Sequence, residues 1–217
     1  MTVRRSIQIH TDAAQLPGEL IVPGDAGGVV VFAHGSGSSR RSPRNVAVAK
    51  RLNVAGLATL LFDLLTPAEA ADRALVFDIE LLASRLEAAI IAVRVADEVR
   101  ALPLGLFGAS TGAAAALVAS TFDGANVGAI VSRGGRPDLA GNVLQRVAAP
   151  VLLIVGSNDP DVLDLNRGAA ERIRAETRVE VVPGATHLFE EPGALDIVSE
   201  LATSWFVRNL VERVRSA

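Results

Sequence analysis

The chain has 217 residues, of which 50% are apolar and 21% are charged, with a net charge of −3; this excludes a disordered or fibrous protein and predicts one compact α/β domain over residues 1–217. The small negative charge gives no attraction to nucleic acid or to an anionic membrane surface. Because there is no cysteine, the chain can form no disulfide, no thiolate metal site and no cysteine nucleophile.

No apolar signal core follows the basic residues near the amino terminus, and no apolar run is long enough to span a bilayer. The lack of cysteine also suits a reducing compartment. We therefore expect a cytoplasmic protein without a membrane partner.

The predicted elements begin with two short alternating stretches at residues 6–10 and 19–22, which indicate an antiparallel strand pair. Helix-like and strand-like patterns then alternate, as is typical of a mostly parallel, doubly wound sheet flanked by helices. Only the connection over residues 63–77 is long, and we expect at most a small apolar rim there and no large cap. Further strands are expected at 29–33, 58–62, 104–107, 127–131, 151–155 and 179–182, and helices at about 42–55, 79–93, 113–117, 139–147, 161–175 and from 192.

A sharp turn between the strand at 104–107 and the following alanine-rich helix carries the pattern Gly108-Ala109-Ser110-Thr111-Gly112. Gly-x-Ser-x-Gly in this context is typical of a nucleophile elbow, in which a strained turn exposes the serine hydroxyl. On this interpretation Ser110 attacks a carbonyl. The alternative is a plain glycine-bounded turn in which Ser110 only caps the helix.

A nucleophilic serine needs a base that accepts its proton, and the chain has three histidines. His10 lies in the opening strand pair, and His34 ends the first central strand, where a backbone turn is needed. His187 follows the last predicted strand in a loop of small residues, so we choose it as the base. The alternative is that His187 is only a packed or exposed loop residue.

The carboxylate that orients the base should lie between the serine and the histidine in the chain. Asp159 meets this demand, because it follows the strand at 151–155 by a few residues. Asp161, Asp164 and Asp138 are its competitors. Asp159 could instead cap the helix that begins at Pro160.

Two backbone amides are the expected donors to an oxyanion. Thr111 directly follows the nucleophile at the start of a helix, whose dipole favours negative charge. Ser36 lies in the small-residue loop at 34–39 and should supply the second amide. The alternative for this loop is a phosphate cradle, which is disfavoured because the loop lacks both the third glycine of the dinucleotide fingerprint and the Gly-Lys-Ser/Thr of a P-loop.

Four motifs together resemble those of the α/β-hydrolase superfamily, and most closely those of its dienelactone-hydrolase-like members. The resemblance spans the chain from about Gly28 to the last helix. It implies a single-domain α/β-hydrolase fold and a serine hydrolase with Ser110 as nucleophile, His187 as base and Asp159 as acid, which requires no metal or organic cofactor. Dienelactone hydrolases proper are associated with a cysteine nucleophile, which serine replaces here. The motifs are His34-Gly35-Ser36-Gly37, Gly108-Ala109-Ser110-Thr111-Gly112, Gly156-Ser157-Asn158-Asp159 and Gly184-Ala185-Thr186-His187.

The expected reaction is hydrolysis of a small carboxylic ester, thioester or lactone through an acyl-enzyme at Ser110. Arg133 or Arg136 could recognise an anionic group on the substrate through paired hydrogen bonds; the alternative is that both are ordinary surface arginines. Acyl transfer to an alcohol or thiol, and a non-catalytic binding protein with the same fold, stay open as alternatives. The apolar face of the last helix could serve the core or a homodimer.

Overall fold

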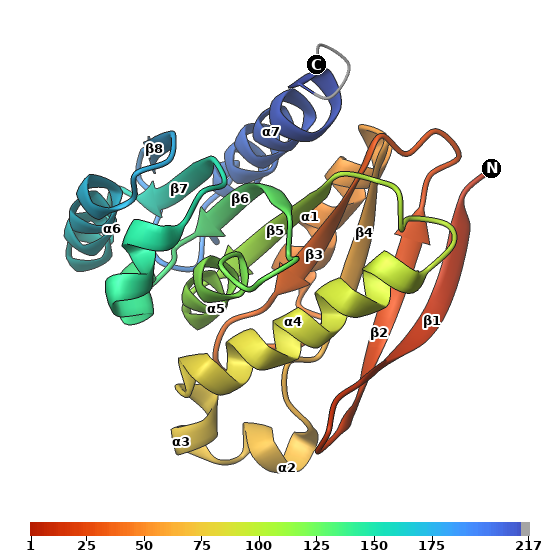
Figure 1. Ribbon diagram of the computed structural model, residues 1–217. Helices are drawn as coiled ribbons and strands as arrows, with labels where there is room; N and C mark the ends of the chain where they lie inside the picture. The colour runs from red at the N-terminus through yellow and green to blue at the C-terminus, as the bar shows by residue number, and fades with distance from the viewer. Residues whose placement is uncertain (214–217) are drawn as a thin grey trace.

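An eight-stranded sheet runs through residues 1–213, the part of the chain that this computed structural model describes (Figure 1). The strand order is β1-β2-β4-β3-β5-β6-β7-β8. β1 (Val3–His10) pairs antiparallel with β2 (Gln15–Val22), and β2 pairs antiparallel with β4 (Leu57–Phe62). All the other pairings are parallel. The predicted antiparallel opening and the mostly parallel sheet are therefore confirmed.

The central strands are buried along their whole length, which explains their uninterrupted apolar runs. Every residue is buried in β3 (Gly28–Ala33), β4, β5 (Leu104–Ala109) and β7 (Val151–Gly156). β6 (Val127–Arg133) and β8 (Thr177–Val182) complete the parallel part of the sheet. Because these strands run in one direction, their carboxyl ends meet at one edge of the sheet, where ligands bind in such folds.

Helices cover both faces of the sheet, as predicted (Figure 1). One face packs against α4 (Ile79–Val95), α5 (Thr111–Ala119) and α6 (Pro160–Arg172). The other packs against α1 (Pro43–Val54) and α7 (Ala194–Phe206). No helix within residues 1–213 is both long and apolar enough to cross a membrane.

Three segments differ in detail from the expected elements. The connection at 63–77 contains two single-turn helices, α2 (Pro67–Ala70) and α3 (Arg73–Val76), and so stays as small as predicted. The expected helix at 139–147 is 3₁₀-helical over Pro137–Arg146, and a positive φ of 58° at Gly141 divides it into two stretches. A π-helix over Val207–Glu212 continues α7.

Candidate active site

Ser110 occupies a strained turn between β5 and α5. Its φ of 51° and ψ of −121° lie outside the regions that residues other than glycine normally adopt. The turn is held by β6 and the loop after it: the Ser110 N–H donates to the Arg133 carbonyl at 3.3 Å, and the Ser110 carbonyl accepts from the Arg136 N–H at 3.1 Å. The Ser110 side chain makes no capping hydrogen bond to α5, so the geometry is that of an elbow and not of a helix cap.

The two glycines of the elbow are required by close packing. A Cβ on Gly108 would lie 2.4 Å from the Ala113 Cα, and a Cβ on Gly112 would lie 2.2 Å from the Ala33 carbonyl oxygen. Both distances are far shorter than any normal contact. Glycine therefore lets α5 turn back against β5 and begin beside the end of β3.

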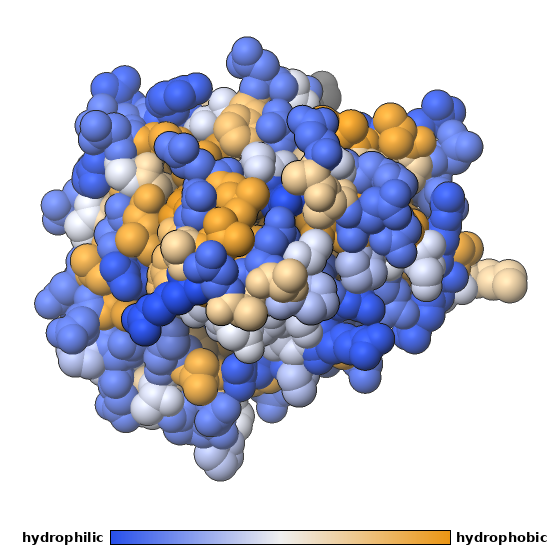
Figure 2. Space-filling model, turned by 90° about the horizontal axis from the view of Figure 1, so that it is seen from below, coloured by the Kyte–Doolittle hydropathy of each residue, from blue (hydrophilic) through white to orange (hydrophobic). Residues whose placement is uncertain are grey.

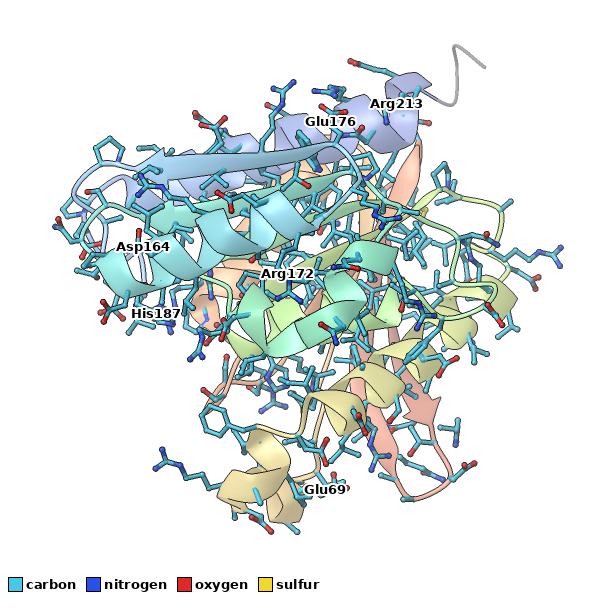
Figure 3. The ribbon with its side chains drawn as sticks, turned by 60° about the vertical axis from the view of Figure 1, so that its left-hand side comes forward. Glu69, Asp164, Arg172, Glu176, His187 and Arg213 are labelled. Atoms are coloured by element: carbon cyan, nitrogen blue, oxygen red, sulfur yellow. The ribbon has the colours of Figure 1, made fainter. Side chains whose placement is uncertain are left out.

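His187 and Asp159 form a hydrogen-bonded pair, with 2.7 Å between His187 Nδ1 and Asp159 Oδ2. Asp159 makes no side-chain capping bond to α6, which removes the alternative role considered for it. Asp164 pairs instead with Arg167, at 3.3 Å, although Figure 3 places it at the same end of the molecule as His187. Within residues 1–213, no group of three or more histidine, aspartate or glutamate side chains gathers as a metal site.

The loops that carry Asp159 and His187 are fixed to each other by backbone contacts. A Cβ on Gly156 would lie 2.1 Å from the Ala185 carbonyl oxygen, so the two loops touch. The Asn158 N–H donates to the Ala185 carbonyl at 2.9 Å, and the Asn158 side chain donates to the Gly184 carbonyl at 2.9 Å. The Gly184 N–H donates to Ser157 Oγ at 2.7 Å. These contacts hold the imidazole and the carboxylate in place relative to each other.

Ser110 and His187 line one small pocket of about 120 Å³, together with Gly35 and Ser36 from the loop after β3. A Cβ on Gly35 would lie 2.9 Å from Ser110 Cβ, so this loop is in contact with the elbow. Thr111 is the first residue of α5, and the N–H at that position has no acceptor within the helix. The structure thus places Ser36 and Thr111, the residues expected to supply the oxyanion donors, beside Ser110.

A larger cavity of about 320 Å³ adjoins the small pocket and shares Gly35, Ser36 and Ser38 with it. The segment at 63–77 supplies much of its wall, which agrees with the expected apolar rim. Seen from below, where α2 and α3 lie in Figure 1, the surface carries apolar patches between polar side chains (Figure 2). The apolar lining residues are Leu64, Leu65, Pro67, Ala70, Val76 and Leu82.

A buried arginine anchors the wall of this cavity. Arg85 of α4 is 3% exposed, and its Nη2 lies 2.8 Å from Oε1 of Glu69 in α2, the residue labelled at the bottom of Figure 3. Arg85 Nη1 also donates to the Thr11 hydroxyl. Glu69 in turn accepts from the Thr66 N–H at 2.8 Å and forms a capping box with Thr66. Because the arginine of this pair is buried and Glu69 is its carboxylate partner, the pair ties α2 to α4 beside the cavity.

His34 braces the loop after β3 against the same segment, a role that the sequence analysis missed. Its Nε2 accepts from the Leu64 N–H at 3.0 Å, and its Nδ1 lies 3.0 Å from the Gly35 carbonyl oxygen. Burial lowers the pKa of His34 below 6.5, so the ring is neutral at pH 7, with its proton on Nδ1. The only feature of the sequence that could have indicated this role is the position of His34 directly before the small residues Gly35, Ser36 and Gly37.

We expect the free energy of unfolding to fall as the pH is lowered from 7 to 5. The unfolded chain binds a proton at His34 near its ordinary pKa of about 6.5, whereas burial lowers the pKa of His34 in the folded protein. The unfolded state therefore binds more protons in this range, which destabilises the fold as the pH falls. Urea unfolding of the wild type and of His34→Gln measures this effect. The variant should lose less stability between pH 7 and 5, and an equal loss would contradict the prediction.

The structure separates the two arginines considered for substrate binding. The Arg136 Nε and Nη2 atoms donate to the two carboxylate oxygens of Asp138 at 2.8 and 2.7 Å, and this hydrogen bonding raises the pKa of Arg136. Arg133 is buried and lines the pocket of Ser110 and His187. Arg44, which the site prediction did not include, lines the same pocket.

Comparison with known proteins gives two similar solved structures and one similar curated protein. The dienelactone hydrolase from Anabaena variabilis ATCC 29413 is 49% identical, with 96% of this chain and 99% of that chain covered and a TM-score of 0.93. Est1E from Butyrivibrio proteoclasticus is 16% identical, with 94% of this chain and 98% of that chain covered and a TM-score of 0.79, which shows the likeness of the fold alone. A Mycobacterium tuberculosis protein (strain ATCC 25618 / H37Rv), provisionally named a phosphoribosyl transferase, is 56% identical over 204 residues.

This last match covers 94% of the present chain and 46% of the relative, so the chain spans about half the length of the curated relatives it matches. The model of the "Dienelactone hydrolase family" matches residues 17–205. These residues include the elbow, the loop after β3 and the loops of Asp159 and His187. The chain therefore belongs to the dienelactone hydrolase family.

Proposed function

We propose that the chain is a serine hydrolase that cleaves small carboxylic esters, thioesters or lactones through an acyl-enzyme at Ser110. One observation carries the proposal: a serine in a strained elbow shares a pocket with a histidine whose Nδ1 lies 2.7 Å from an aspartate. A nucleophile, a base and a group that orients the base are what acyl transfer through serine requires.

In the proposed mechanism, Ser110 Oγ attacks the substrate carbonyl while His187 Nε2 accepts the hydroxyl proton. The Asp159 carboxylate accepts a hydrogen bond from His187 Nδ1–H, which leaves Nε2 unprotonated and able to accept the serine proton. The amides of Ser36 and Thr111 stabilise the oxyanion of the tetrahedral intermediate. His187 then returns the proton to the leaving alcohol or thiol. Water then attacks the acyl-enzyme carbonyl while His187 accepts a proton from it. His187 returns this proton to Ser110 Oγ, and the acid is released.

The cavities favour small substrates. The adjoining apolar cavity of about 320 Å³ is at the lower end of the range for small-molecule sites, and the pocket at Ser110, about 120 Å³, is smaller still. The apolar wall from 63–77 can bury a short hydrocarbon portion of the substrate. The Arg85–Glu69 pair holds this wall in place, so the cavity is formed before the substrate arrives.

The M. tuberculosis relative is named after a transferase, but the match to this chain covers only 46% of that protein. Ser110, His187 and Asp159 supply a nucleophile and a base for an acyl group, and the loop at 35–40 lacks the P-loop and dinucleotide patterns. The residues of the site therefore favour ester hydrolysis over phosphoribosyl transfer.

A fluorophosphonate probe tests the proposal directly, because it reacts with a serine that a neighbouring base has activated. We expect one adduct per chain by intact mass, located at Ser110 by peptide mapping and absent from Ser110→Ala. A folded wild-type protein that stays unlabelled, or that is labelled at another serine, would contradict the proposal.

A further inference from the structure

β8 is the last strand of the sheet, at the edge farthest from β1 (Figure 1). It pairs with β7 alone among the strands within residues 1–213, in parallel, from Thr177 opposite Val151 to Val182 opposite Gly156. An edge strand presents unpaired backbone N–H and C=O groups along its outer side. β8 therefore offers a surface to which a further strand can add.

The hydrogen bonds to β7 show which residues of β8 direct their backbone groups outward. The Glu176 carbonyl accepts from the Val151 N–H at 2.8 Å, and the Val182 carbonyl accepts from the Ser157 N–H at 3.0 Å. Because the backbone groups of successive residues point alternately to the two sides of a strand, the even-numbered residues bond to β7. No turn or loop within residues 1–213 forms a backbone hydrogen bond with the outward, odd-numbered ones. These outward residues are Thr177, Val179 and Val181.

The side chains of the even-numbered residues lie on the α7 face of the sheet, because the Arg178 guanidinium lies 5.6 Å from the centroid of the Trp205 ring in α7. Arg178 Nη2 is also 3.5 Å from Glu176 Oε1, a carboxylate that two further arginines share. Glu180 lies on the same face by alternation and has no ion pair within residues 1–213. The edge thus carries one basic and one acidic side chain, two residues apart.

A two-fold axis sets the register in which two copies of β8 can pair antiparallel. Outward residues must face each other, so the axis passes beside one residue of the strand. An axis beside Arg178 would place two arginines opposite each other, and an axis beside Glu180 two glutamates. Axes nearer the ends of β8 would leave much of the strand unpaired. An axis beside Val179 places Arg178 of each copy opposite Glu180 of the other, and Thr177 opposite Val181.

Apolar side chains flank this edge on both faces of the sheet. Val181 of β8 is 39% exposed, and Ile197 of α7 is 40% exposed. Ile197, Leu201 and Trp205 recur every four residues on α7 and so form one stripe. Because Trp205 contacts Arg178, this stripe follows the edge. A second copy joined at β8 would remove part of this apolar surface from water, which favours association.

The other edge of the sheet lacks such complementarity. β1 reads Val-Arg-Arg-Ser-Ile-Gln-Ile-His, with two arginines and no acidic residue. Arg4 and Arg5 are paired with Glu19 and Glu98 of the same chain. Basic side chains on an edge strand discourage the addition of a further strand. The charges therefore favour β8 over β1 as an interface.

We infer that β8 is an interface between two copies of this chain, which pair antiparallel about Val179 and join their sheets into one. The outward residues of both strands then form hydrogen bonds with each other, and two Arg178–Glu180 pairs between the copies fix the register. The inference concerns assembly and does not depend on the function proposed for Ser110.

The test measures the mass of the full chain by analytical ultracentrifugation over a range of protein concentrations. We expect a wild-type dimer, with twice the chain mass of 22.5 kDa. Arg178→Glu and Glu180→Arg each place like charges opposite each other, and each should raise the Kd of the dimer by about tenfold or more. Arg4→Glu is the matched control, with the same change of charge on the other edge strand, and should leave Kd within about twofold.

An equimolar mixture of Arg178→Glu and Glu180→Arg tests the register itself. In a mixed pair, both acidic positions of one chain face the basic positions of the other. We therefore expect the mixture to dimerise more tightly than either variant alone. A mixture that is no tighter than its components, a monomeric wild type, or dissociation by Arg4→Glu in place of the β8 variants would overturn the inference.

Amide hydrogen exchange of the wild type carries the test if a variant is unfolded by circular dichroism. The outward N–H groups of Val179 and Val181 should be protected as well as the amides that bond to β7, because the second copy covers them. Exchange as fast as that of the outer amides of β1 would overturn the inference.

Discussion

Replacement of Ser110 by alanine is expected to lower kcat for a small activated ester by at least about 10³-fold. The substitution removes the proposed nucleophile, Oγ, and leaves the oxyanion donors and the cavity intact. Residual turnover above the uncatalysed rate is expected, because those donors still stabilise attack by water. A continuous assay of 4-nitrophenol release from both proteins measures the effect.

Ser120→Ala is a suitable control for this experiment. Ser120 follows the other end of α5, where its hydroxyl donates to the Leu117 carbonyl at 2.7 Å. We expect this variant to keep its activity within about twofold, as for a substitution distant from the site. If Ser110→Ala and Ser120→Ala are equally active and both are folded by circular dichroism, Ser110 is not the nucleophile.

Much of the fold could be predicted because its central strands are buried on both faces. Such strands appear in the sequence as continuous apolar runs. The run predicted at 151–155 corresponds to β7, which extends one residue further, to Gly156. The two single-turn helices at 63–77 could not be predicted in the same way, because four residues are too short for an apolar period. The position of α2 depends on the capping box of Thr66 and on the distant Arg85, and α3 begins at the side-chain cap of Asp72.

The candidate site, like the fold, has features that local sequence patterns predict and features that depend on long-range contacts. Local sequence patterns predicted the loops of the site, because they contain glycines such as Gly108 and Gly112. The structure shows that a Cβ at either position would collide with the backbone. The choice between neighbouring side chains depends on contacts between segments far apart in the chain. Asp159 contacts His187 because the loops after β7 and β8 touch. The sequence alone separates Asp159 from Asp164 much less clearly than this contact does.

The two arginines after the elbow illustrate the limit most clearly. Arg133 and Arg136 are three residues apart and equally plausible as anion binders in the sequence. Arg136 pairs with the carboxylate of Asp138, two residues further on. Arg133 ends a buried strand, and its buried Nε and Nη1 atoms have no hydrogen-bond partner among residues 1–213. Burial and the absence of a partner are properties of the folded protein, so only the structure could separate them.

Asp159→Asn is expected to lower kcat by about 10³- to 10⁴-fold while the protein stays folded. Asparagine has nearly the same shape as aspartate, but its amide group can donate to His187 Nδ1 where the carboxylate only accepts. Donation to Nδ1 favours the tautomer with its proton on Nε2, which cannot accept the Ser110 proton. Rates of ester hydrolysis and of fluorophosphonate labelling should therefore fall together, because both depend on the activated serine.

Asp164→Asn is the matched control, since Asp164 is an exposed aspartate of α6 at the same end of the molecule (Figure 3) and pairs with Arg167. We expect its activity to stay within about twofold of the wild type, because an exposed ion pair contributes little. The reverse result, with Asp164→Asn impaired and Asp159→Asn active, would show that the 2.7 Å contact between Asp159 and His187 does not orient the base. Loss of activity in Asp159→Asn alone would assign to that contact the tautomer control on which the whole mechanism depends.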